Sequence, residues 1–395
     1  REMAKSFLAD KDICIVAYGE TKIERRGGRS AYEIAAEVAE QLYKKTKLGP
    51  SDVDGVTFCV PLSECSNPFW SGYATEYLGI SARWLQTSDI GGASAIGNVA
   101  RAAMAIKSGL CETVMIMGAD APSTQWRAYY GSYRNEFWDP VGVQGPPGAF
   151  GLLMNRYEHQ YGLDFTGLGA LAVAQRNGAI KNKNAYEKLR QKITVDDYIN
   201  SRQVSSPLRL LDSVMWCDGG NGLMMMKTSR AKKLGLTDRV YPISYDEISN
   251  FDCANQTADI TKTGHSITGP SALKQAKLKP KDVDMFHPYD DFLFAVMLKT
   301  EQCGFAKEGQ GSQFLRDTDL GPKGDLPLNT GGGQISCGQP GLAGGGVNLV
   351  EAVRQLMGDG GRRQVPNARN ALVTGIGVIP YGRNWGSANA MVLVN

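Results

Sequence analysis

The sequence predicts an α/β fold in which one layered unit occurs twice. The clearest sign is a repeated segment: Lys47–Asp54 matches Lys277–Asp284, both with the pattern Lys-Leu-x-Pro-x-Asp-Val-Asp. A strand-like run precedes each copy, at Ile13–Glu20 and Val240–Glu247. After each copy, apolar residues recur at helical spacing: Val99, Ala103 and Ile106 in the first unit, and Leu349, Val353 and Leu356 in the second. A further strand-like run follows each of these helices, at Val114–Met117 and Ala371–Val373. Matches that keep their order along the chain indicate a duplication.

The elements of each unit alternate between strand and helix. In the segment 31–43, for example, Ile34, Val38 and Leu42 recur at helical spacing and form one apolar face. Strands that alternate with helices favour parallel-rich sheets with helices packed on their faces. We therefore expect a layered α/β core.

Three parts of the chain follow from this repeat: a first half at 10–118, an insertion with a return to the core at 119–235, and a second half at 236–395. The insertion begins with many aromatic residues, among them Trp126 and Tyr130. Long insertions on α/β cores often form the walls of a binding site. We expect Trp126 and Tyr130 to contact substrate; an aromatic core within the insertion is the alternative, and both can hold.

Composition excludes several classes of function. The formal net charge of the 395-residue chain is +3, with no basic stripe of the kind that nucleic-acid binders carry. No apolar run approaches the roughly 20 residues of a membrane span, and no signal peptide is recognised. The eight cysteines are scattered without a CxxC pair, which favours reduced thiols in a cytoplasmic protein, and three histidines disfavour a metal site in this chain.

Four motifs in this order resemble the thiolase superfamily, in its sterol-carrier-protein-type branch. They are the segments DIGGASA at 89–95, YDDF at 289–292, NTGGGQISCGQPG at 329–341 and GIG at 375–377. The resemblance covers essentially the whole chain. It implies a duplicated α-β-α-β-α layered fold with an inserted loop domain.

The chain departs from thiolases where their chemistry resides. Gly92 stands where a thiolase has its nucleophilic cysteine, Tyr289 and Gln339 stand where the family has histidines, and the second, acid–base cysteine has no counterpart. This pattern is similar to the steroid side-chain aldolases and to the thiolase subunit of benzoylsuccinyl-CoA thiolase. The resemblance implies a CoA thioester as substrate with no covalently bound cofactor, a homodimer, and a small zinc-binding OB-fold partner of the DUF35 type. The basic stretch at 181–202 could meet the CoA phosphates, or it could be a solvated helical face.

Without a cysteine thiolate, the usual acyl-enzyme cannot form at position 92. A glycine there adds space and leaves the helix-end amides free, and with the backbone of Gly375 and Gly377 they could hold a thioester oxygen as it becomes negative. Such an oxyanion pocket stabilises an enolate. We therefore expect retro-aldol cleavage of a β-hydroxyacyl-CoA; thiolysis of a bulky β-ketoacyl-CoA by free CoA, or a non-catalytic scaffold, are the alternatives.

Three side chains are candidates for the proton transfers. Tyr289 is the expected base or acid, and His287 would share its face on a strand and could supply the basicity. Gln339 can donate a hydrogen bond to the thioester carbonyl, or it is structural.

Other polar residues of the motifs have supporting roles in this prediction. Asp290 and Asn329 are expected near the substrate, with Asp290 orienting its neighbours or capping a helix. Cys337 is the alternative nucleophile, but it is offset from both thiolase cysteine positions.

Overall fold

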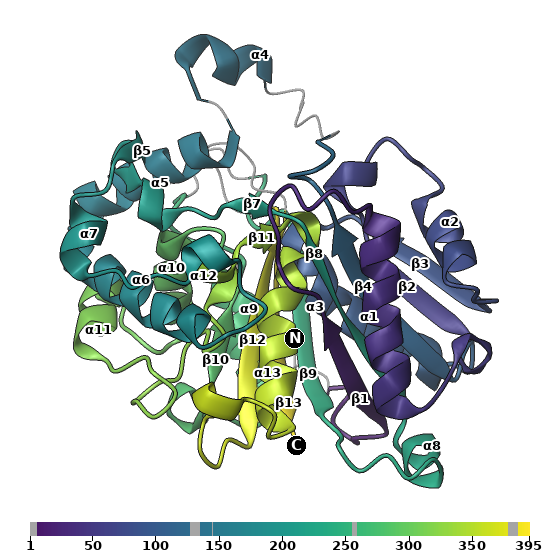
Figure 1. Ribbon diagram of the computed structural model, residues 1–395. Helices are drawn as coiled ribbons and strands as arrows, with labels where there is room; N and C mark the ends of the chain where they lie inside the picture. The colour runs from purple at the N-terminus through teal and green to yellow at the C-terminus, as the bar shows by residue number, and fades with distance from the viewer. Residues whose placement is uncertain (1–5, 127–134, 144, 255–258, 378–385) are drawn as a thin grey trace.

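The computed structural model describes residues 6–126, 135–143, 145–254, 259–377 and 386–395. Two sheets lie face to face with helices between them and on both outer sides, which confirms the predicted α/β fold (Figure 1). The first sheet has the order β1-β8-β4-β2-β3, formed by Ile13–Glu20, Gly219–Lys227, Thr113–Asp120, Gly55–Cys59 and Trp84–Ser88. The second has the order β10-β12-β13-β9, formed by Phe286–Pro288, Asn370–Gly377, Ser387–Val394 and Tyr241–Ser249.

The sheets are mixed, where the sequence predicted parallel-rich ones. The strands that were predicted do run in one direction in each sheet, but β8 and β13 run against both of their neighbours. Strand β13 follows β12 after a short connection, and such a connection joins antiparallel rather than parallel neighbours.

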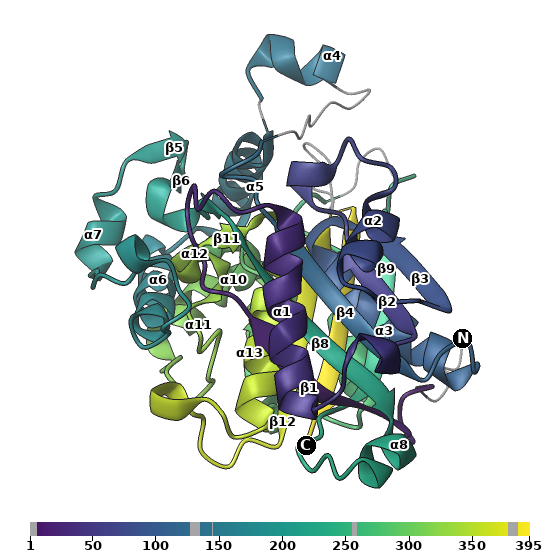
Figure 2. The same ribbon diagram turned by 45° about the vertical axis from the view of Figure 1, so that its right-hand side comes forward.

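Two helices fill the space between the sheets. These are α3 (Ser94–Lys107) and α13 (Gly345–Leu356), and every residue of α13 is buried because both sheets and α3 surround it. The outer face of the first sheet carries α1 (Ala31–Thr46) and α2 (Trp70–Tyr77). The outer face of the second sheet carries α9 (His265–Gln275) and α10 (Leu293–Gln302), so that the fold has five layers (Figure 2).

The repeated segment has the same structure in both halves. Lys47 and Lys277 both adopt the left-handed conformation after a helix, with φ of 61° and 59°. Each copy ends at an aspartate that fixes the start of a core strand. Asp54 accepts hydrogen bonds from the backbone of Glu112 and Thr113, and Asp284 accepts them from the backbone of Arg369 and Asn370. The sequence repeat is therefore a helix-to-strand connection whose carboxylate ties two neighbouring strands together.

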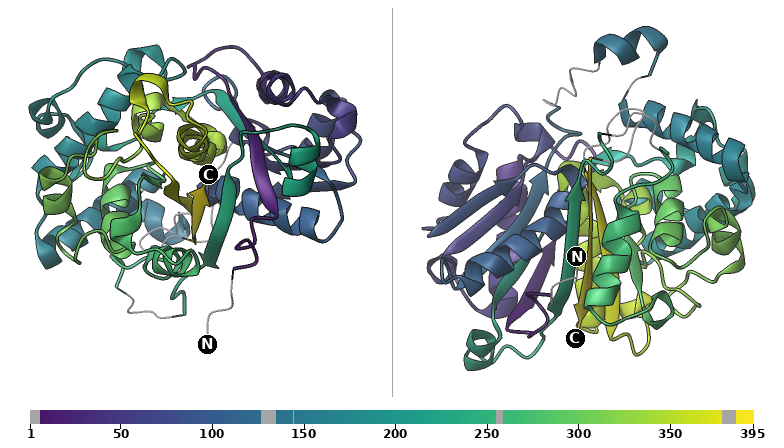
Figure 3. Two further views of the ribbon diagram at one scale, coloured as in Figure 1. Left: turned by 90° about the horizontal axis from the view of Figure 1, so that it is seen from below. Right: turned by 180° about the vertical axis from the view of Figure 1, so that it is seen from behind.

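The insertion packs beside the second half, as views from the front and from behind both show (Figure 1, Figure 3). Its described elements are α4 (Asn135–Trp138), α5 (Gly145–Tyr161), α6 (Phe165–Ile180), α7 (Val195–Ile199), β5 (Gln203–Ser205), β6 (Leu208–Arg209) and β7 (Trp216–Cys217). Buried residues of α5 and α6 join the core of α10. The chain leaves the first sheet at Asp120 and returns at Gly219, and these two residues are paired in register.

Four short elements complete the set of α-helices and β-strands in the described residues: α8 (Thr228–Lys233), α11 (Gly311–Asp317), α12 (Gly333–Cys337) and β11 (Gln339–Pro340). None of the helices in the described residues is long and apolar enough to cross a membrane.

The central helices are the part of the core most sensitive to truncation. Leu349 of α13 is 1% exposed between the sheets, so Leu349→Ala removes apolar contacts and leaves a cavity. We expect the variant to lose about 3 kcal/mol of unfolding free energy, measured as a lower Tm. Leu234→Ala is the matched control because Leu234 is 42% exposed, and an equal Tm for both variants would contradict this packing.

Candidate active site

The turn that opens α3 is enclosed by the backbone of two other elements. Residues Gly91–Ala93 form this turn, and a Cβ atom on Gly345 would lie 2.1 Å from the carbonyl oxygen of Gly92. A Cβ on Gly375 would lie 2.8 Å from the Cα of Ala93, and one on Gly377 would lie 1.7 Å from the carbonyl oxygen of Ile90. These glycines are needed because the central helix α13 and strand β12 both approach the turn within backbone contact. The structure thus brings Gly92, Gly375 and Gly377 together.

The ring of Tyr289 fills the place where a side chain of residue 92 would be. A Cβ on Gly92 would lie 2.2 to 2.4 Å from the Cε2, Cζ and Oη atoms of Tyr289. The space expected beside Gly92 is therefore occupied, which corrects the sequence-based picture of an open position. A cysteine at position 92 and a tyrosine at position 289 cannot both be present in this geometry.

The Tyr289 hydroxyl is held by amide side chains. Gln339 donates from Nε2 to the hydroxyl over 3.3 Å and to Oε1 of Gln334 over 3.1 Å. Burial raises the pKa of Tyr289 well above its usual value of 10, with the negative charge of Asp291 as the next cause. The phenol therefore keeps its proton at neutral pH and can donate it.

A buried charge pair lies behind Tyr289, and the sequence analysis did not find it. Lys299 of α10 is fully buried and donates from Nζ to the backbone carbonyl of Tyr289. Burial lowers the pKa of Lys299, and burial raises the pKa of Asp291; each charge partly offsets the shift of the other. A lysine within the apolar run LFAVMLK was the available signal, since a buried lysine needs a partner.

Asp290 and Asn329 hold protein groups. The Asp290 carboxylate accepts from the backbone of Gln334 and Ile335 over 2.9 and 3.2 Å, and also from the side chains of Gln175 and Asn348. Burial raises the pKa of Asp290 to about 6, and these donors oppose that rise.

Asn329 donates from Nδ2 to the carbonyl of Pro288 over 3.0 Å. Both Asp290 and Asn329 are fully buried, so their observed role is to position the segment that carries Tyr289. Their contact with substrate stays a prediction.

Two buried histidines lie on the second sheet and its helix layer. His287 is in β10, two residues before Tyr289; burial lowers its pKa to about 4, and neither ring nitrogen has a hydrogen-bond partner among the described residues. His265, which the sequence analysis did not select, lies 3.0 Å from the Gly375 carbonyl through Nε2. A carbonyl only accepts, so Nε2 carries the proton there, and burial keeps the ring neutral by lowering its pKa. His265 thereby fixes the strand that approaches the Gly92 turn.

No cysteine near this site has the character of a nucleophile. Cys337 is buried, donates from Sγ to the Gly331 carbonyl over 3.0 Å, and has a pKa that burial raises far above the ordinary value. Cys59, below α3, is fully buried with its pKa raised to about 12. The described residues also contain no group of three or more His, Cys, Asp or Glu side chains that could hold a metal.

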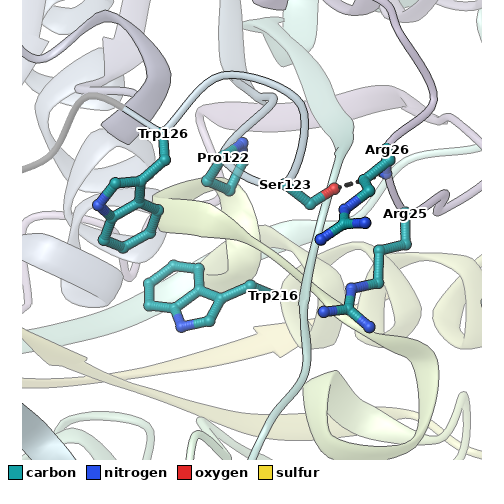
Figure 4. Close-up of a pocket in the computed structure, with 6 residues that line it drawn as sticks. All are labelled: Arg25, Arg26, Pro122, Ser123, Trp126 and Trp216. Atoms are coloured by element: carbon teal, nitrogen blue, oxygen red, sulfur yellow. Dashed lines mark hydrogen bonds between the residues drawn. The ribbon is translucent and has the colours of Figure 1, made fainter.

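A cavity of about 370 Å³ adjoins this site. It is lined by Trp126, Trp216, Pro122, Ser123, Arg25 and Arg26, with the two indole rings on one side and the two guanidinium groups on the other (Figure 4). Trp216 pairs with Gln339 in the ladder of β7 and β11, which links the cavity to the amide that contacts Tyr289. The structure therefore places Trp126 in a cavity beside the site, whereas Tyr130 lies outside the described residues.

Comparisons with known proteins agree with this architecture. Residues 248–386 match the family model for thiolase C-terminal domain-like proteins. The steroid side-chain-cleaving aldolase of Thermomonospora curvata is 30% identical over 93% of this chain and 96% of its own, and the 17-hydroxy-3-oxo-4-pregnene-20-carboxyl-CoA lyase of Mycobacterium tuberculosis is 29% identical over 93% and 97%. A benzoylsuccinyl-CoA thiolase subunit of Thauera aromatica is 28% identical over 53% of this chain and 54% of its own. The solved structure of the Ltp2–ChsH2(DUF35) aldolase has a TM-score of 0.85 at 27% identity and covers 97% of this chain and 98% of its own.

The fold, the glycine-enclosed turn and these relatives define a class: the chain belongs to the thiolase superfamily. Within it, the chain falls in the sterol-carrier-protein-type branch, beside the steroid side-chain aldolases. It is an enzyme that cleaves a carbon–carbon bond in a CoA thioester, which removes the scaffold alternative.

The overlap between position 92 and Tyr289 can be measured with a double-mutant cycle. Gly92→Ala should cost about 1–3 kcal/mol of unfolding free energy because the new methyl group displaces the Tyr289 ring. In the Tyr289→Ala background the same change should cost far less, because the ring is gone. Thermal unfolding of the four proteins tests this, and additive effects would show that the ring does not occupy that space.

The thiol assignments predict a labelling pattern. Iodoacetamide at pH 7.5 should modify the exposed Cys65 and Cys253 and leave Cys59 and Cys337 unmodified, because only the thiolate reacts and burial raises the pKa of those two thiols. Peptide mass spectrometry reads the pattern, and activity should persist after labelling. Inactivation in step with labelling of Cys337 would make that thiol the nucleophile.

Proposed function

We propose that this enzyme carries out a retro-aldol cleavage of a β-hydroxyacyl-CoA. The observation that carries the proposal is the Tyr289 ring in the space of a thiolase nucleophile, beside an intact helix-end turn. Acyl transfer to the protein would need a nucleophile at that place. A proton donor there suits an enolate, which needs a proton on carbon to become product.

The steps balance without any added reactant. The thioester oxygen binds the backbone at Gly92 and the adjoining strand of Gly375 and Gly377, and this oxygen takes up negative charge as the bond between the α- and β-carbons breaks. The β-hydroxyl loses its proton to a base and becomes the carbonyl of an aldehyde or ketone. The enolate accepts a proton from the Tyr289 hydroxyl and leaves as a shortened acyl-CoA. The proton that the base took then returns to Tyr289.

His287 is our proposed base, and Gln339 orients the phenol. His287 is neutral because burial lowers its pKa to about 4, so its imidazole has a free lone pair at neutral pH. Strand β10 ends at Pro288, and alternate residues of an extended chain share a face, so we expect His287 and Tyr289, the residue after the strand, to face the same side. The Gln339 amide donates to the Tyr289 oxygen and would also steady the negative charge left there after proton transfer.

The acyl group that we propose is bulky and ring-bearing. The two indole rings of the neighbouring cavity support this, as do relatives whose names describe steroid side-chain cleavage. A CoA thioester is the only cofactor-like molecule that this reaction uses.

We also propose that the enzyme works in the cytoplasm as a homodimer bound to a small zinc-binding OB-fold protein of the DUF35 type. The aldolase of similar structure is a complex with a DUF35 protein, which supports the second partner. Strand β3 supports the dimer: it is the edge of the first sheet, and Leu85 on it is 40% exposed. An exposed edge strand is ready to pair with a second chain.

Thiolysis remains the second candidate because the benzoylsuccinyl-CoA thiolase subunit is also related. One assay separates the two reactions. The protein and its zinc partner, incubated with a ring-bearing β-hydroxyacyl-CoA and no free CoA, should release an aldehyde or ketone. Cleavage that occurs only with a β-ketoacyl-CoA and free CoA would replace the aldolase with a thiolase.

Tyr289→Phe keeps the ring over Gly92 and removes only the hydroxyl. We expect turnover of the β-hydroxyacyl-CoA to fall by about a hundredfold, with little change in Kd, because the proton donor is lost and the packing is kept. Tyr73→Phe on the outer helix α2 is the control and should behave as the wild type, since Tyr73 is 52% exposed. An unaltered kcat in Tyr289→Phe would remove Tyr289 from the mechanism.

A further inference from the structure

We propose that the cavity between Trp126, Trp216, Arg25 and Arg26 selects acyl groups whose ring carries a negatively charged substituent, such as a carboxylate. This inference rests on the proposed function, since it assigns the occupant to the acyl part of a CoA thioester. It adds a charge requirement that a bulky hydrophobic acyl group does not have.

The aromatic side of the cavity suits a flat ring. The rings of Trp126 and Trp216 meet edge to face, with centroids 5.2 Å apart and planes 77° apart. An indole face and an indole edge at right angles form a corner, in which a third ring can stack on one and contact the other. The volume of about 370 Å³ is within the range of ordinary small-ligand sites, and Figure 4 shows the rings turned toward the same space.

The opposite side supplies positive charge without a neutralising carboxylate. Arg25 and Arg26 are exposed, and no described residue forms an ion pair with either guanidinium. Of the acidic residues nearby, Glu24 pairs with Arg29. Unpaired guanidinium groups in a cavity recognise carboxylates through paired N–H donors.

Asp218 is engaged elsewhere and builds the frame of the cavity. Its carboxylate accepts from the backbone of Gly27, Ser123 and Thr124, and from the Thr124 hydroxyl. These bonds join the loop of the two arginines to the loop that leads to Trp126. The Asp218 carboxylate thus accepts four hydrogen bonds from the protein itself, and these bonds hold the shape of the cavity without a ligand.

The position of the cavity assigns it to the acyl group. Trp216 is the register partner of Gln339, and neighbouring strands are about 4.8 Å apart. The Gln339 amide in turn contacts the Tyr289 hydroxyl, so that the cavity wall begins beside the reacting atoms. In a CoA thioester the nucleotide hangs at the far end of the pantetheine arm, whereas the acyl group begins at the reacting carbon.

Binding measurements with a matched pair of thioesters test the charge requirement. Isothermal titration of the protein in its complex would compare phenylpropanoyl-CoA with its para-carboxy derivative. We expect the carboxylate to improve Kd by about tenfold at low salt and by less as salt rises. The double variant Arg25→Ala/Arg26→Ala should lose this preference and still bind the uncharged thioester, whereas Lys22→Ala, an exposed cation outside the cavity, should keep it.

Further arms separate the other outcomes. If the double variant keeps the preference, the arginines do not read the acyl group and the inference is wrong. The double variant could instead bind both thioesters more weakly to the same extent. If this loss of affinity disappears with dephospho-CoA thioesters, which lack the 3′-phosphate, the arginines bind the nucleotide and the inference is also wrong. Because these are equilibrium measurements, a charge preference without retro-aldol turnover would overturn the proposed reaction alone.

Discussion

The chemistry of this protein depends on a steric exclusion between two positions far apart in the chain. The Tyr289 ring and a side chain at position 92 would need the same volume, so only one of them can be present. With glycine at position 92, the Tyr289 ring fits against the backbone turn, and its phenol occupies the space that a side chain at position 92 would take. The surrounding glycines are explained by the same close packing, because a side chain on any of them would overlap the turn that two further backbone segments contact.

Burial is the main cause of the pKa shifts of the ionisable groups around Tyr289. The Tyr289 hydroxyl, the Asp290 and Asp291 carboxyls, the Lys299 ammonium and the two histidines all lie in the interior, where the uncharged form of each is favoured. Hydrogen bonds from four donors oppose the rise in the pKa of Asp290, and the opposite charges of Asp291 and Lys299 oppose each other's shift. The result is a site with a protonated phenol at its centre, which suits moving a proton more than forming a covalent adduct.

Much of this could be read from the sequence because it lies in local patterns. The repeat Lys47–Asp54 and Lys277–Asp284 predicted two matching halves, and the structure explains the repeat through the aspartates that end it. The glycine motifs predicted that the backbone of Gly375 and Gly377 joins the helix-end amides at Gly92, and the structure brings these three glycines together. In contrast, no pattern in the sequence indicated that β8 and β13 run antiparallel to their neighbours, since the direction of a strand depends on the path of the connection that leads to it.

Contacts between distant segments also escaped the sequence analysis. That the Tyr289 ring fills the space over Gly92 depends on how the segment after β10 lies against the turn before α3, and periodicity does not report such packing. The role of Lys299 depends on which side of α10 faces Tyr289. The motifs could therefore be recognised in the sequence, but the contacts of their individual side chains could be assigned only from the three-dimensional structure.

The point at which the insertion leaves the core has an evolutionary consequence. Asp120 and Gly219 are register partners at the ends of the adjacent inner strands β4 and β8, so the insertion leaves and re-enters the first sheet at one place. A segment anchored in this way can lengthen, shorten or exchange residues without altering the strand register beneath it. Substrate range could thus diversify among descendants of this protein while the turn at Gly91–Ala93 stayed unchanged.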